Sequence, residues 1–215
     1  ASPWPALRRQ PAFQVLPSKA CDLASCIDFA DPIERVKFTV DQFPVFLKRI
    51  VDELSLSAGS FHWIEDSEMP VPYRDLVVHN KVMTSTLADL HSSGIGLEVL
   101  NETNERSGHV REVVLFADPT GKPVEYGAIR IQLDHFRPEV SKAIVEGKEL
   151  LGSTLNRMQY TYASRPKGFF FIQAPLVCQK RFGCSEDSLL YGRYNQLFNS
   201  EENETASFIE ILPLV

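Results

Sequence analysis

The sequence has no long hydrophobic run and no excess of basic residues. None of its apolar stretches approaches the roughly 20 residues that a membrane-spanning helix needs. Its 22 Lys and Arg are outnumbered by 28 Asp and Glu, which gives a net charge of −6 over 215 residues. Nucleic acids and anionic membrane surfaces both favour clustered Lys and Arg, so neither is expected as a partner.

Several familiar site signatures are also missing. There is no G-x-S-x-G motif, which argues against a serine hydrolase of that type. Gly94-Ile95-Gly96 lacks the third glycine of a dinucleotide-binding loop. The sequence contains two close cysteine pairs: Cys21 with Cys26, and Cys178 with Cys184. The second pair is spaced one residue too far apart for zinc and no His follows either pair at ligand distance, so no metal is expected.

The cysteines instead predict an oxidising compartment. An even count, together with the sequons that begin at Asn101 and Asn203, favours a secreted protein with N-linked glycans at both asparagines. We predict two local disulfides, Cys21–Cys26 and Cys178–Cys184. The first residues, ASPWPAL, fit either a removed signal peptide or a trimmed chain. The alternative is four free thiols in a cytoplasmic protein.

Two regions differ in their patterning. Residues 1–40 are rich in proline and show little periodicity, so they predict an extended N-terminal arm. Residues 41–215 predict a single domain, which opens with an amphipathic helix over Asp41–Leu54. Further helices are expected within Arg74–Ser92, over Pro138–Gly147 and, after a loop over Gly147–Gly152, over Leu155–Met158.

The strongest strand signal is His109–Leu133, two long Val- and Ile-rich runs joined by the turn residues Asp118–Gly121. Other strands are expected at Phe61–Glu65, Gly96–Asn101, Gly168–Ala174, Leu189–Phe198 and Ala206–Leu212. Hairpins without regular βαβ alternation predict an α+β fold, in which helices flank an antiparallel sheet of about six strands.

Two charged residues fall on apolar strand faces. Arg111 alternates with Val113 and Leu115, and Glu210 shares its face with Phe208 and Leu212. Burying a lone charge is costly, so each of the two needs compensation. They could pair with each other or face water. They could also frame a pocket in which the planar fork of Arg111 binds a ligand carboxylate.

Several short blocks resemble the chorismate lyase family, in the right order along residues 73 to 213. Met83-Thr84 with Leu87 resembles its "MT…L" segment, and Arg111–Leu115 followed by Ala117-Asp118 and Gly121–Pro123 resembles its "REVLL…ADG.P" hairpin. Leu151-Gly152 matches its "LG" loop. Tyr191-Gly192-Arg193 resembles "WGRR", and Glu210 with Pro213 resembles the closing "EL.LP".

The resemblance implies an enclosed pocket for a small aromatic carboxylic acid, with no cofactor. Arg111 would bind the carboxylate and Glu210 the opposite hydroxyl, as the catalytic pair. Substrate-binding positions carried over from the family are Met83, Leu151, Gly152, Arg130 and Arg193. Arg130 enters because it lies two residues beyond Ala128, where family members often carry an arginine. The implied reaction is pyruvate elimination from chorismate, leaving 4-hydroxybenzoate.

The long N-terminus, the cysteine pairs and the sequons would make the chain a secreted, eukaryotic (fungal-type) member of this family, and a monomer. Two alternatives to the lyase remain. One is a secreted, non-catalytic protein that binds a small aromatic acid. The other is an enzyme of the same fold that acts on a different substrate.

Overall fold

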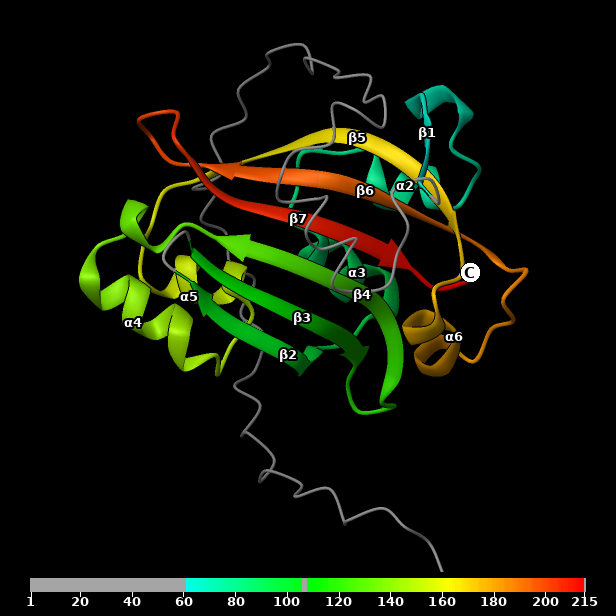
Figure 1. Cartoon of the computed structure of the whole chain (residues 1–215), viewed down its shortest axis with the longest axis horizontal. Helices are drawn as coiled ribbons and strands as arrows, with labels where there is room; N and C mark the ends of the chain where they lie inside the picture. The colour runs from blue at the N-terminus through cyan, green and yellow to red at the C-terminus, as the bar shows by residue number, and fades with distance from the viewer. Residues whose placement is uncertain (1–60, 106–107, 215) are drawn as a thin grey trace, which may run out of the picture.

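The protein is represented by a computed structural model in which residues 61–105 and 108–214 are described. They form one antiparallel sheet with five α-helices and two short 3₁₀-helices (Figure 1). The strands are β1 (Phe61–Ile64), β2 (Ile95–Glu105), β3 (Gly108–Ala117), β4 (Lys122–Ile131), β5 (Ala163–Gln173), β6 (Leu189–Phe198) and β7 (Glu204–Leu212). The α-helices are α2 (Tyr73–Val77), α3 (Met83–His91), α4 (Pro138–Glu146), α5 (Leu151–Arg157) and α6 (Leu176–Phe182), and the 3₁₀-helices are η3 (Asp66–Glu68) and η4 (Leu133–His135).

The strand order is β1-β5-β6-β7-β4-β3-β2, and every neighbouring pair is antiparallel. The predicted α+β class is therefore confirmed, although the sheet has seven strands and not about six. The short strand β1 pairs over its whole length with β5, from Phe61 opposite Ile172 to Ile64 opposite Phe169. Glu210 lies on β7, the middle strand of the sheet, whereas Arg111 lies on β3, next to the edge strand β2.

The β3–β4 hairpin forms where the sequence predicts it. Gly121 adopts the positive φ of 68° that glycine accepts without a Cβ clash. Its N–H donates to the carbonyl of Ala117 at 2.9 Å, and the Thr120 hydroxyl donates to the same carbonyl at 3.0 Å. Arg111 lies opposite Ile129, and Leu115 lies opposite Glu125.

Some helices begin and end where the sequence predicts, and others do not. α4 begins at Pro138, and Gly147 ends it in the left-handed conformation, as predicted. The segment predicted as one helical region within Arg74–Ser92 is divided into α2 and α3. α5 begins at Leu151, inside the predicted Gly147–Gly152 loop, so Leu151 and Gly152 belong to its first turn.

Two other boundaries differ from those predicted. β2 continues to Glu105, beyond the expected end at Asn101, because its pairing with β3 extends to Glu105 opposite Gly108. β5 begins at Ala163, five residues before the predicted Gly168, and a register irregularity between Pro166 and Gly168 accommodates the proline.

The predicted Cys178–Cys184 disulfide is wrong, because both residues are free thiols. The sequence between them forms most of α6 and its end at Gly183. Cys178 is fully buried in an apolar cluster of the sheet, where burial raises the pKa of its thiol. The other predicted disulfide, Cys21–Cys26, lies outside the described residues, as do the predicted arm over 1–40 and helix over Asp41–Leu54.

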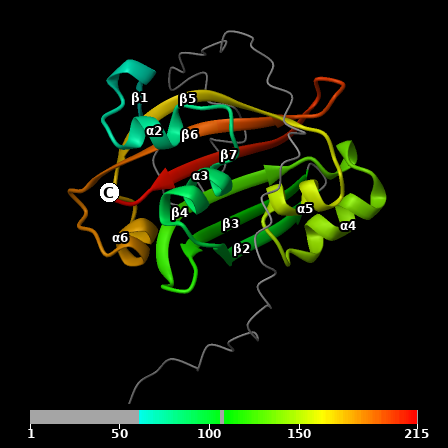
Figure 2. The ribbon, with the colours of Figure 1, turned by 180° about the vertical axis from the view of Figure 1, so that it is seen from behind.

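The two faces of the sheet carry different helices. The face that bears Arg111, Ile129 and Glu210, called here the inner face, is covered by α2, α3, α4 and α5 (Figure 2). α6 packs on the opposite face through Cys178. Alternate residues of each strand point to the inner face. A site can therefore form there, between these side chains and the helices that cover them.

Candidate functional site

A cavity lies between the inner face and the beginnings of α3 and α5. The cavity volume, counted as the space that the centres of water molecules can occupy, is about 70 Å³. This is enough for several waters or a small organic ligand. Most of its wall is apolar: Val82, Met83, Leu97, Val113, Leu115, Ile129, Ile131, Leu150, Leu151, Leu197 and Phe208. The polar or charged side chains on the wall are Thr84, Arg111, Glu125, Asn195 and Glu210.

The structure brings together five of the seven site residues predicted from the sequence. Arg111, Glu210, Met83, Leu151 and Gly152 all line the cavity. They come from two central strands and from the first turns of two helices, which are far apart in the chain. The other two predicted residues, Arg193 and Arg130, are not part of the cavity wall.

Arg111 is a buried cation without a carboxylate partner among the described residues. Arg111 is only 4% exposed to solvent. The guanidinium donates from Nε and Nη2 to His109 Nε2, at 3.2 and 3.1 Å, and from Nη2 to the carbonyl of Ile144. Burial lowers the pKa of Arg111, and the charge of Glu102 raises it. These contacts orient the guanidinium but leave its positive charge unneutralised.

His109 holds Arg111 as a neutral imidazole. Its Nδ1 lies 2.8 Å from Asn104 Oδ1, which can only accept, so Nδ1 carries the proton and Nε2 accepts from Arg111. Burial and the charge of Arg111 lower the pKa of His109, whereas Glu102 raises it. The chain from Asn104 through His109 to Arg111 therefore fixes the direction of the guanidinium.

The charge of Glu210 is paired with that of Arg193 and not with that of Arg111. The two residues are opposite each other on β6 and β7, and Arg193 Nε donates to Glu210 Oε2 at 2.5 Å. Arg193 is fully buried. Its remaining donors reach the carbonyls of Val77, His79 and Lys81 at 3.2, 3.0 and 3.1 Å. Arg193 thus holds the α2–α3 connection to the sheet, and its predicted contact with substrate stays a prediction.

His79 completes the surroundings of Arg193. Its Nδ1 accepts from the Lys81 backbone N–H at 3.1 Å and lies 3.3 Å from Arg193 Nη1, while Nε2 lies 3.0 Å from Thr86 Oγ1. Burial, and next the charge of Arg193, lower the pKa of His79 to about 4. At neutral pH the ring is therefore uncharged beside the arginine.

Arg130 belongs to the opposite face of the sheet. It lies across from Val110, whereas Arg111 lies across from Ile129, so Arg130 and Arg111 project on opposite sides. Arg130 does share its face with Ala128, as predicted. That face, however, is not the one that bears Arg111, and Arg130 does not line the cavity.

The sequence-based search missed Glu125. This residue is 4% exposed, lines the cavity, and its Oε2 has no hydrogen-bond partner among the described residues. Burial and the charge of Glu210 raise the pKa of Glu125 well above its ordinary value, although Arg193 opposes them. The signal was present in the sequence: Glu125 shares a strand face with Gly127 and Ile129, as Arg111 does with its apolar neighbours.

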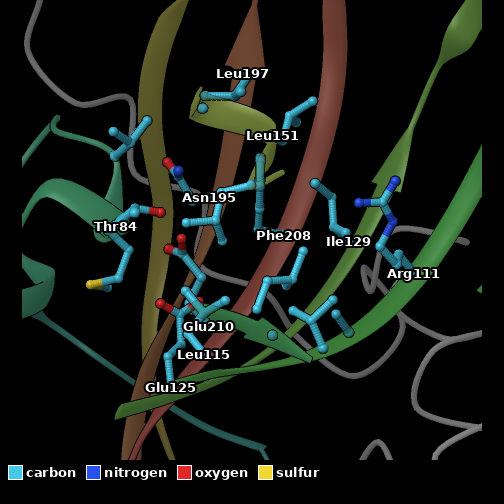
Figure 3. A pocket seen from close by; sticks show the side chains of 18 of the residues that line it. Thr84, Arg111, Leu115, Glu125, Ile129, Leu151, Asn195, Leu197, Phe208 and Glu210 are labelled. Carbon is cyan, nitrogen blue, oxygen red and sulfur yellow. The ribbon is translucent and has the colours of Figure 1, made fainter. Parts of the chain in front are cut away.

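The cavity is polar at two separate ends. Figure 3 shows Arg111 on one side and the carboxylates of Glu125 and Glu210 on the other, with Ile129 and Phe208 between them. A ligand that fills the cavity would therefore meet a cation at one end, an apolar middle, and acidic groups at the other end.

Residues 61–105 and 108–214 contain neither a cluster of metal-binding side chains nor a helix that could span a membrane. No group of three or more His, Cys, Asp or Glu side chains there could hold a metal ion. No helix in the same part of the chain is long and apolar enough to span a membrane.

Comparison with known proteins identifies the fold only. No protein-family model matches the sequence, and no curated protein matches it either. Among solved structures, PhnF from Mycobacterium smegmatis has a TM-score of 0.51 at 8% identity, over 79% of this chain and 80% of that chain. This similarity supports the chorismate lyase-like fold that the sequence resemblance implies.

Two other similar structures are named as transcriptional regulators. One is a GntR-family transcriptional regulator from Bacillus cereus, with a TM-score of 0.39 and 10% identity over 56% of this chain and 92% of that chain. Another, from Bordetella bronchiseptica, is the ligand-binding domain of a regulator assigned to the same family, with a TM-score of 0.42 and 8% identity over 55% and 84%.

The predicted lyase function is contradicted by these findings. Most of the similar structures are named as transcriptional regulators or their ligand-binding domains, and not as lyases. The geometry agrees with this correction, because Glu210, the predicted partner of the substrate hydroxyl, is hydrogen-bonded to Arg193. The comparisons give no support for a secreted, glycosylated lyase, and Cys178 and Cys184 are free thiols. The secreted location and the glycans at Asn101 and Asn203 stay predictions.

Proposed function

We propose that this domain is an effector-binding domain, which holds a small aromatic carboxylic acid in the cavity and does not transform it. The observation that carries the proposal is Arg111, a buried guanidinium with no carboxylate partner in the described part of the chain. A buried charge without a counterion is costly. A ligand carboxylate would supply the missing charge and accept charge-assisted hydrogen bonds.

The walls suit a flat apolar ligand body. Ile129 and Phe208 lie opposite each other on β4 and β7, between the two polar ends of the cavity. Leu151 adds apolar surface from the first turn of α5. Burial of an aromatic ring against such side chains is favourable in proportion to the apolar area removed from water.

The polar groups are arranged for binding and not for reaction. His109 and Ile144 hold Arg111 in place, and Arg193 holds Glu210, so neither predicted catalytic group is free to move a proton. Most of the structures with a similar fold are named as regulators, which agrees with a regulatory, effector-binding role. The extent of the domain over 41–215 and its monomeric state stay predictions.

Calorimetric titration with 4-methylbenzoate tests this function. The wild type is expected to bind, and Arg111→Met to bind more weakly by about 1.5–3 kcal/mol, the usual contribution of a hydrogen bond to a charged group. That range corresponds to a Kd increase of roughly 10- to 150-fold. Arg130→Met is the matched control, because it removes an arginine from the opposite face and should leave the Kd unchanged. Equal affinities in wild type and Arg111→Met would refute the proposal.

A further inference from the structure

The carboxyl group of Glu125 has no role in the contacts described so far. It lies in the cavity, and its Oε2 is without a hydrogen-bond partner among the described residues. Native proteins satisfy nearly all buried polar atoms, so each exception needs an explanation. Glu125 is 4% exposed, which makes bulk water an insufficient partner.

The nearby cation cannot serve Glu125. Arg193 donates from Nε to Glu210, and from its other nitrogens to the carbonyls of Val77, His79 and Lys81. These hydrogen bonds pair Arg193 with Glu210 and attach it to the α2–α3 connection. The acidic end of the cavity therefore contains two carboxyl groups and one cation that is already committed.

Gly127 packs closely beside Glu125. It lies opposite Glu210 and, as a glycine, it presents no side chain to the cavity that it lines. A Cβ at this position would lie 3.3 Å from Glu125 Oε1 and 3.1 Å from Val113 Cγ2. A larger side chain would crowd the carboxyl group, so glycine keeps this part of the cavity accessible to a ligand group.

We propose that Glu125 forms a second subsite, which receives an ammonium group of the ligand, so that the effector is an aromatic aminocarboxylate. This inference rests on the proposed function, because the carboxylate of the same ligand is the one assigned to Arg111. The ammonium would donate to Glu125 and lie near Glu210, and its positive charge would stabilise the carboxylate form of Glu125.

The separation of the two ends fits one substituted ring. Glu125 lies opposite Leu115, which is four residues from Arg111 on β3, or about 13 Å along the strand. Side chains from both ends reach into this interval, and Ile129 and Phe208 line its middle. A ring with a carboxylate and an aminomethyl group at opposite positions is a suitable probe of this arrangement.

Proton release provides a readout specific to Glu125. It is faced by Glu210 from β7 and, beyond it, by Arg193 from β6, whereas β3 presents Leu115 and α3 presents Thr84, which do not titrate. Burial and the charge of Glu210 raise the pKa of Glu125, which favours its acid form when no ammonium is bound. When the ammonium enters, the carboxyl proton passes to the buffer and the carboxylate accepts a hydrogen bond from the ammonium.

The experiment compares 4-(aminomethyl)benzoate with 4-methylbenzoate by calorimetry, using wild type and Glu125→Gln. In the wild type, the amine is expected to bind roughly tenfold tighter or better, because it adds a buried charge pair. The ratio should fall to about one in Glu125→Gln, which keeps the shape but not the charge. Titration in two buffers of different ionisation enthalpy should show proton release in the wild type that Glu125→Gln lacks.

The outcomes separate the two proposals. If 4-methylbenzoate binds through Arg111 but the amine gives no gain, the ammonium subsite is refuted and the carboxylate site stands. If the amine gains affinity equally in wild type and Glu125→Gln, Glu125 is not its partner and the inference is also refuted. Thermal melting of Glu125→Gln shows whether the variant folds, and Glu125→Leu repeats the comparison with a side chain that cannot hydrogen-bond.

Discussion

The Arg193–Glu210 pair should be a major contributor to stability, and Arg193→Met tests this directly. The substitution leaves Glu210, which is 4% exposed, without its counterion and frees three backbone carbonyls of the α2–α3 connection. Removing one partner of a buried ion pair costs about 3–5 kcal/mol. The lost carbonyl contacts add to this, so the total is a large part of the roughly 5–15 kcal/mol that stabilises a typical domain.

Urea unfolding followed by circular dichroism gives the free energy of unfolding for each variant. The double variant Arg193→Met/Glu210→Leu removes both charges, and it should be more stable than Arg193→Met because no unpaired charge stays buried. The matched control is Arg157→Met, which breaks an exposed pair with Glu149 at 3.0 Å and should cost no more than about 1 kcal/mol. A cost for Arg193→Met as small as that of the control would refute the structural role.

Two further predictions concern the acidic end of the cavity and the response to pH. Gly127→Val should weaken 4-methylbenzoate binding by roughly tenfold or more, because even a Cβ at this position would lie 3.1 Å from Val113 Cγ2. Calorimetry measures the change in affinity. Unchanged affinity in a folded variant would show that the ligand binds elsewhere. Stability should fall as pH drops from 6.5 toward 4, because the unfolded chain protonates His79 and His109 in that range while the folded state, whose histidine pKa values are lowered, does not. For His79 this amounts to about 1 kcal/mol between pH 7 and 5, allowing for its partial exposure. Urea unfolding at the two pH values should show a smaller loss of unfolding free energy in His79→Asn than in the wild type, because Asn keeps an acceptor near Nδ1 but does not titrate. An equal loss in both proteins would assign the pH effect to other groups.

Strand alternation was sufficient to find two of the central site residues. Arg111 and Glu210 were identified because a charge on an apolar strand face needs compensation, and both line the cavity. What compensates each of them could not be predicted, because the answer depends on which strands become neighbours. The order β6-β7-β4-β3 places Arg193 beside Glu210 and keeps Arg111 two strands away from Glu210.

Other errors arose from contacts between segments that are distant in sequence. Arg193 was predicted to contact substrate, and its partners in the structure are Glu210 and the backbone carbonyls of Val77, His79 and Lys81, which no local pattern reveals. Arg130 was placed by analogy with a neighbouring position, and only the register against β3 shows that its face is opposite to that of Arg111. Cys178 and Cys184 suggested a local disulfide, although the segment between them forms α6.

Glu125 was accessible to the same reasoning that found Arg111. It lies in a strand whose alternate residues Gly127 and Ile129 are also on the inner face, but the glycine weakened the apolar pattern around it. Its importance comes from being left without a hydrogen-bond partner, which is a property of the folded surroundings and not of the sequence.

The most direct test of the account is a crystal structure of the protein with 4-methylbenzoate. We expect the ligand ring between Ile129 and Phe208, with its carboxylate at about 3 Å from the Arg111 guanidinium, the distance of a charge-assisted hydrogen bond. A ligand bound elsewhere, or bound in the cavity with its carboxylate away from Arg111, would contradict the central claim.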